Sequence, residues 1–160
     1  MSGELKKAAS YPLADEILSV AESRCKTAGK RLTPARREAY LAIRAQEKPV
    51  SAYDLIAVLE KIKGKKIAPL TVYRHLDFLT CVGLVHRLES THSYVACDDP
   101  GHTHESHYLL CSACGDANEV ESPALENLLD EIAGTHGFQT QNAIVEIKGV
   151  CGKCAVEEGE

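Results

Sequence analysis

Apolar residues recur at helical spacing in the first quarter of the chain. Between positions 13 and 28 one falls every three or four residues, and Gly29 follows as a stop signal. Thr33 and Pro34 then supply an N-cap followed by proline at the first helical position. The pattern predicts one helix ending near Ala28 and a second from Pro34 to about Arg44.

Two further helices are predicted before the pattern changes. Ser51 and Asp54 resemble a capping box. The stripe expected to be buried on the helix that follows is Leu55, Ile56, Val58, Leu59 and Ile62. The fourth predicted helix runs from about Pro69 to Thr80, and its buried face consists of Val72, Leu76 and Leu79.

After Gly83 the spacing of apolar residues becomes that of strands. Residues 84–88 and 93–97 read as two strands, and the polar residues 89–92 read as the turn between them. Helices followed by such a hairpin are typical of the winged form of the helix-turn-helix. Its second helix, here residues 69–80, is expected to enter the major groove of DNA.

The last third of the chain predicts a small α/β module. Residues 98–106 are polar and without apolar periodicity, and short strands are expected at 107–110 and 117–121. Ser122 and Pro123 open a helix whose apolar residues are Leu125, Leu128, Leu129 and Ile132, and residues 138–150 form a last extended run. The predicted fold class is α+β, with a winged-helix domain at 1–97, a hinge at 98–106 and an α/β domain at 107–160. The second domain is too small to be stable alone, so zinc and self-association are expected to supplement its core.

The distribution of charged residues also differs between the two parts of the chain. The formal net charge is −5, but residues 1–89 carry 16 Lys and Arg against 10 Asp and Glu, a net of +6. Residues 90–160 carry 2 against 13, a net of −11. The asymmetry indicates a basic module for a polyanion joined to an acidic one, although two solvated surfaces of unlike composition would look the same. The chain has no apolar run of membrane-spanning length and no signal-peptide core, so a soluble cytoplasmic protein without a membrane partner is expected.

Two Cys-x-x-Cys pairs indicate a metal. Cys111 and Cys114 precede Cys151 and Cys154, and each pair can bring two thiolates to one ion from a tight turn. Together the pairs complete the tetrahedral four-cysteine shell that zinc prefers. The alternatives are two disulfides or a redox Cys-x-x-Cys, which the apparent cytosolic location disfavours.

A second group of ligand-type residues surrounds the hinge. Its members are His86, Cys97, His102, His104, His107 and Glu119. A site built from them would join the two halves of the protein, which is where a metal-dependent switch must act. The alternative is a set of solvated histidines beside a small buried cysteine.

Four motifs occur in sequence along the chain: Leu32-Thr-Pro-Ala-Arg36, Val50-Ser-Ala-Tyr-Asp-Leu55, Leu70-Thr-Val-Tyr-Arg74 and Cys111-x-x-Cys-Gly115. In residues and order they resemble the ferric uptake regulator family of metal-dependent repressors, and the resemblance covers residues 12–155. The stretches 85–90 and 93–97 are similar to the zinc uptake regulator branch in particular.

The resemblance implies a homodimer with a structural zinc on the four cysteines and a regulatory zinc on His86, Cys97, His104 and Glu119. His102 and His107 offer alternative donors to His104, and Ala143 stands where some relatives place a histidine for a third site. By the same matching, Tyr53 and Arg74 would reach bases, and an arginine pairing with guanine is the commonest specific contact. The implied phosphate contacts are Tyr73, Thr71, Lys63, Lys65 and Lys66.

The sequence thus predicts a zinc-responsive transcriptional repressor that binds palindromic operator DNA and controls zinc uptake genes. A sensor of iron, manganese or peroxide would share the fold, but the thiolate of Cys97 favours zinc over ferrous iron. A zinc hydrolase would need an open metal position and a general base, and no motif supplies them. A structural zinc adaptor would leave the basic winged helix unexplained, so no enzymatic activity is expected.

Overall fold

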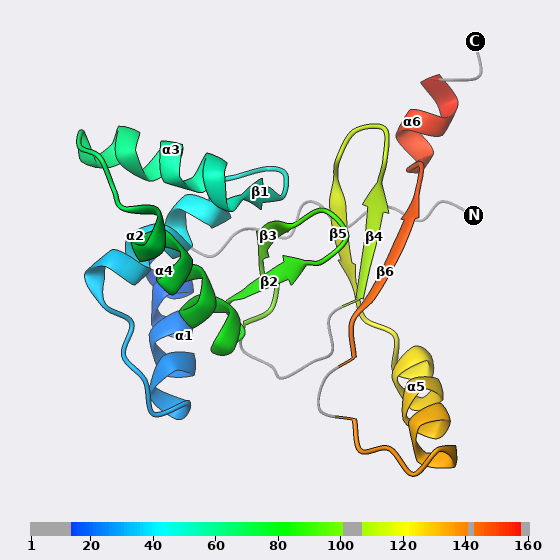
Figure 1. Cartoon of the computed structure of the whole chain (residues 1–160). Helices are drawn as coiled ribbons and strands as arrows, with labels where there is room; N and C mark the ends of the chain where they lie inside the picture. Colours follow the sequence, from blue (N-terminus) through cyan, green and yellow to red (C-terminus); the bar gives the residue numbers. More distant parts are fainter. Residues whose placement is uncertain (1–13, 101–106, 141–142, 158–160) are drawn as a thin grey trace.

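The computed structural model of the chain describes residues 14–100, 107–140 and 143–157. The first half contains, in chain order, α1 (Ala14–Thr27), α2 (Pro34–Arg44), β1 (Val50–Ser51), α3 (Ala52–Lys63), α4 (Pro69–Cys81), β2 (Val85–Leu88) and β3 (Ser93–Ala96). The second half contains β4 (His107–Cys111), β5 (Ala117–Val120), α5 (Pro123–Thr135), β6 (Val145–Gly149) and α6 (Gly152–Glu157). The fold is α+β, with a helical half and a half centred on a small sheet (Figure 1).

The helix starts follow the capping signals of the sequence. The hydroxyl of Thr33 accepts a hydrogen bond from the backbone N–H of Arg36, and that of Ser51 accepts one from Asp54. Ser122 caps α5 in the same way by accepting from Leu125. Each hydroxyl satisfies a backbone donor that has no partner within its helix, which fixes where the helix begins.

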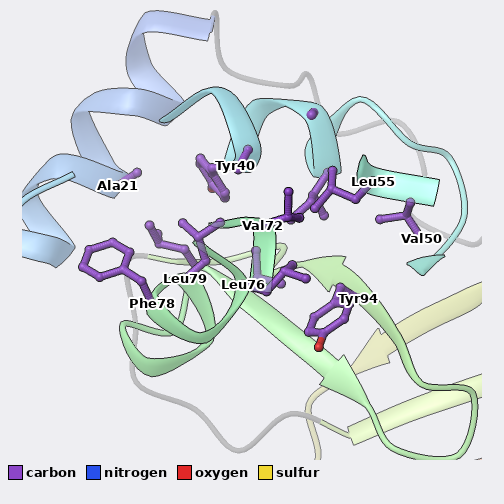
Figure 2. Packing of buried hydrophobic residues seen from close by; sticks show 14 of the residues in the cluster. Ala21, Tyr40, Val50, Leu55, Val72, Leu76, Phe78, Leu79 and Tyr94 are labelled. Carbon is purple, nitrogen blue, oxygen red and sulfur yellow. The ribbon is translucent and has the colours of Figure 1, made fainter. Parts of the chain in front are cut away.

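The core of the first half lies between α2, α3 and α4 and is closed by the first sheet. Tyr40, Leu55, Val72, Leu76 and Leu79 are fully buried there, and Figure 2 shows them converging with Val50 and Tyr94 from β1 and β3. This burial orients α4 so that its opposite face is exposed.

The predicted burial of Ile62 is wrong. Its side chain is 62% exposed, whereas Leu59, one turn earlier on α3, is buried. Ile62 lies in the last turn of the helix, just before Gly64 ends it in the left-handed conformation. Ala52 at the start of α3 is buried instead.

Two three-stranded sheets carry the rest of the architecture. In the first, the order is β1-β3-β2, all antiparallel, with His86 opposite Val95. In the second, the order is β5-β4-β6; β4 pairs antiparallel with β5 and parallel with β6. The parallel pair places the carboxyl ends of β4 and β6 side by side, so the two cysteine pairs that follow these strands meet.

The wing, which is the β2–β3 hairpin with its turn at residues 89–92, packs against the second sheet (Figure 1). Leu88 of the wing is buried with Tyr108 and Leu110 of β4, and Val95 and Ala117 lie against this cluster. The winged helix and the C-terminal sheet are therefore in direct contact through a small apolar interface.

Candidate metal centres and DNA-binding surface

The four predicted cysteines converge at one end of the second sheet. Cys111 ends β4, Cys114 lies in the turn after it, and Cys151 and Cys154 lie immediately before and within α6. Their sulfur atoms all lie within 4.8 Å of one another, and the sulfurs of Cys114 and Cys151 are 3.9 Å apart. All four are free cysteines. A separation of 3.9 Å is far longer than a disulfide bond but close to the roughly 3.8 Å edge of a tetrahedral zinc–thiolate shell.

The backbone around this cluster favours thiolates. The N–H groups of Cys114 and Cys151 point at the sulfur of Cys111, at 3.5 and 3.3 Å. These hydrogen bonds lower the pKa of Cys111 to about 6. The opposite shift occurs at Cys154, where hydrogen bonds to Cys151 and then to Cys114 raise the pKa to about 12. Such a set can lose all its protons together only if a cation neutralises the charge, which is the chemistry of a closed zinc site.

A second cluster joins the wing to the second sheet. It contains His86 of β2, Cys97 just after β3, and Glu119 of β5, whose ligand atoms lie within 4.8 Å of one another. The Nε2 atom of His86 is 3.6 Å from a carboxylate oxygen of Glu119. Burial of Cys97, and next to it the charge of Glu119, raises the pKa of this thiol to about 12. The cluster offers an imidazole, a thiol and a carboxylate, three of the four ligands that a tetrahedral zinc takes.

The remaining histidines of the hinge divide into two groups. His104 and His102 lie outside the described residues. His107 is described and does not belong to the cluster. It is 1% exposed, and neither ring nitrogen has a hydrogen-bond partner among the described residues. Its neighbour Tyr108 lies near His86, with ring centroids 5.9 Å apart, so alternation along β4 directs His107 to the other face.

Cys97 is also tied to the helical half. Arg44, the last residue of α2, donates a hydrogen bond from its guanidinium group to the backbone carbonyl of Cys97 at 3.0 Å. The guanidinium also lies 3.4 Å from the hydroxyl of Tyr40, which is buried in the core. The position of this ligand is thus set by α2 as well as by the hairpin, a link that no spacing in the sequence indicates.

The predicted DNA contacts lie on the exposed side of α3, α4 and their connection. Tyr53 is 79% exposed on α3, and the exposed residues of α4 include Thr71, Tyr73 and Arg74. Lys65 and Lys66 line a hollow of about 260 Å³ together with Lys63 and Thr71. Lys66 also binds the carboxylate of Glu60 at 3.1 Å. Leu70, 62% exposed beside Thr71, is an apolar residue of this surface that the sequence reasoning missed.

The family model of the ferric uptake regulator family matches residues 27–148. The chain belongs to this family. It is 38% identical over 146 residues to the zinc uptake regulation protein of Escherichia coli, covering 89% of this chain and 84% of that protein. The family match and this identity confirm the resemblance seen in the sequence motifs.

Solved structures of two zinc uptake regulators share the fold of this family member. One, complexed with zinc and DNA, superposes with a TM-score of 0.86 at 35% identity and covers 94% of this chain and 100% of that chain. The other, holo XcZur, superposes with a TM-score of 0.79 at 38% identity and covers 90% of this chain and 99% of that chain. Among the described residues, no helix is both long and apolar enough to cross a membrane.

Proposed function

We propose that this regulator is a zinc-responsive transcriptional repressor, a homodimer that binds operator DNA when zinc fills the site formed by His86, Cys97 and Glu119. The observation that carries the proposal is the position of that site. Two of its ligands belong to the wing region and the third belongs to the second sheet. A metal bound there stabilises one arrangement of the two halves, as a switch requires.

Two zinc ions per chain are proposed, with different roles. Cys111, Cys114, Cys151 and Cys154 hold a structural ion, because four thiolates complete the tetrahedral shell and leave no open position. The regulatory ion takes its fourth ligand from the hinge, where His104 is the proposed donor. The thiolate in its shell favours zinc over the harder ferrous or manganous ion. With one thiolate and one carboxylate, the bound site is electrically neutral.

The C-terminal half supplies the dimer surface. In the described part of the chain α5 has no buried residue, and Leu128 and Ile132 are about half exposed. On β6, Ile147 is 54% exposed. A half this small cannot bury its apolar residues alone, and a second copy provides the missing cover. Two-fold symmetry then presents two α4 helices to two half-sites of a palindromic operator.

The proposed DNA contacts are of two kinds, those with base edges in the groove and those with backbone phosphates. Arg74 and Tyr53 are proposed to reach base edges. Thr71, Tyr73 and the lysines around the hollow are proposed to bind phosphates, which position the protein without reading sequence. The exposure of Tyr53, Tyr73 and Arg74 on α3 and α4 supports this assignment.

The proposal is tested by zinc content and operator binding. A duplex selected from random-sequence DNA with zinc-loaded protein serves as the operator in fluorescence anisotropy. We expect tight binding with two zinc ions per chain, and weak binding after mild chelation leaves one ion. Cys97→Ala should retain one ion and lose zinc-dependent binding. Cys81→Ala, which removes an exposed thiol outside both clusters, should behave as the wild type. Zinc-dependent operator binding by Cys97→Ala would contradict the proposed regulatory site.

A further inference from the structure

A glutamate of the second sheet holds the tip of the wing. One carboxylate oxygen of Glu146, on β6, accepts a hydrogen bond from the backbone N–H of Glu89 at 2.6 Å. The other oxygen accepts one from the N–H of Ser90 at 3.0 Å. Both donors lie in the turn of the wing, so a single side chain binds two consecutive backbone groups more than fifty residues away in the sequence.

The interaction is well suited to fix a loop. Each oxygen has its own donor, and hydrogen bonds to an ionised acceptor are stronger than neutral ones. Burial by itself raises the pKa of Glu146, but the hydrogen bonds from Ser90 and Glu89 outweigh it and hold the pKa below its usual value. The carboxyl group is therefore ionised at neutral pH. The side chain of Glu89 turns to Arg87, 3.5 Å away, so Glu146 holds the wing by hydrogen bonds from Ser90 and from the backbone of Glu89 rather than by an ion pair with the wing.

The position of this contact relative to the metal cluster gives it a role. Along the wing, His86 lies at the metal cluster, Leu88 lies in the apolar contact with Tyr108, and Glu89 and Ser90 lie at Glu146. A metal alone attaches the wing near one point and leaves it able to pivot. A second attachment beyond the apolar contact fixes the direction of the wing and, with it, of α4.

We propose that Glu146 is a positioning residue for DNA binding, a latch that orients the wing on the second sheet so that zinc binding sets the direction of α4. The effect of Glu146 on DNA binding rests on the proposed function. The protection of the two turn amides by its carboxylate is independent of that function.

Hydrogen exchange tests the latch without DNA. In the zinc-loaded dimer, we expect the amides of Glu89 and Ser90 to exchange roughly tenfold faster in Glu146→Ala. Glu146→Gln keeps one acceptor oxygen and brings an NH₂ group against the second donor, so one of the two amides should stay protected. Glu47→Ala removes the same charge from an exposed position between α2 and β1 and should change neither amide. Unchanged exchange in Glu146→Ala, or equal acceleration in Glu47→Ala, would overturn the latch.

Operator binding tests the positioning role, because electrostatics alone predicts the opposite sign. Removing a negative charge favours binding to DNA. The latch predicts instead that Glu146→Ala binds the selected operator roughly five- to tenfold more weakly at saturating zinc, with two zinc ions still bound per chain. Equal or tighter binding together with faster amide exchange would show a contact that does not position α4. Failure of the wild-type protein to bind DNA with zinc would contradict the proposed function, while the exchange result would still decide the latch.

Discussion

At the scale of single residues, Cys97 sets how zinc binding depends on pH. Its pKa is raised to about 12 by burial and by the nearby Glu119, so the metal-free site holds a protonated thiol at neutral pH. In the proposed regulatory site zinc binds the thiolate, so each ion that enters must displace that proton. The affinity of the regulatory site should therefore rise about tenfold per pH unit and fall by the same factor as pH decreases.

The zinc affinity of the regulatory site is measured by competition with a fluorescent zinc chelator, on protein whose four-cysteine site is already filled. The range between about pH 7.5 and about pH 8.5 lies above the usual titration of histidine, so the slope there reports the thiol. Cys97→Ala should bind more weakly and lose this slope. An affinity that is flat with pH in the wild-type protein would mean that Cys97 is not a ligand.

The sequence predicted most of the residues of the site, and the reasons differ from residue to residue. Cys111 and Cys114 are indicated by their spacing, because two thiolates that reach one ion from a tight turn are separated by two residues. His86, Cys97 and Glu119 were found through the family motifs and through ligand chemistry near the hinge. Glu146 left no such signal, because a carboxylate that binds backbone N–H groups requires no particular residue type at the other end.

At the scale of elements, Gly83 controls the junction between α4 and the wing. Its φ is +71°, and a Cβ atom added there would lie 2.8 Å from a terminal guanidinium nitrogen of Arg24. The Nε atom of Arg24 donates to the carbonyl of Val82 at 3.0 Å, which holds the guanidinium at the junction. Alanine at this position would combine backbone strain with displacement of Arg24.

We expect Gly83→Ala to lower the free energy of unfolding by about 2 kcal/mol. Gly64→Ala is the matched control, because Gly64 also has a positive φ, +65°, but nothing lies within 4 Å of an added Cβ. The free energy of unfolding of Gly64→Ala should fall by less, about 1 kcal/mol, because only backbone strain contributes. Both are measured by denaturant unfolding of the zinc-loaded protein. If the two variants lost equal free energy of unfolding, displacement of Arg24 would not contribute to the cost at Gly83.

The sequence located strands least well where distant partners define them. The strand β1 has only two residues, Val50 and Ser51, and exists because β3 lies beside it. Likewise, among the described residues of the expected run at 138–150, only 145–149 form a strand, because these pair with β4. Helices α1 to α5 carry their own periodicity, and the sequence located them closely, whereas the short helix α6 was not predicted.

At the scale of the whole molecule, the two halves have opposite tasks and opposite charges. The basic excess belongs to the winged-helix half, and the acidic excess belongs to the half that carries the second sheet. Long-range electrostatics therefore favours approach of the winged helix to DNA and disfavours approach of the second half. In the proposed mechanism, zinc at the junction, together with Glu146, determines which orientation of the winged helix the dimer offers.

The proposed function has zinc and DNA favour the same arrangement, so each must tighten the binding of the other by the same factor. We expect the selected operator to slow removal of the regulatory zinc by a chelator, whereas a random duplex at equal concentration should slow it much less. The measurement follows zinc in the chelator with time, and Cys97→Ala, which keeps only the four-cysteine ion, sets the background. If the operator binds tightly but zinc leaves at the same rate with and without it, the metal at His86, Cys97 and Glu119 does not control the orientation of α4. That ion would then hold the two halves together without changing their affinity for DNA.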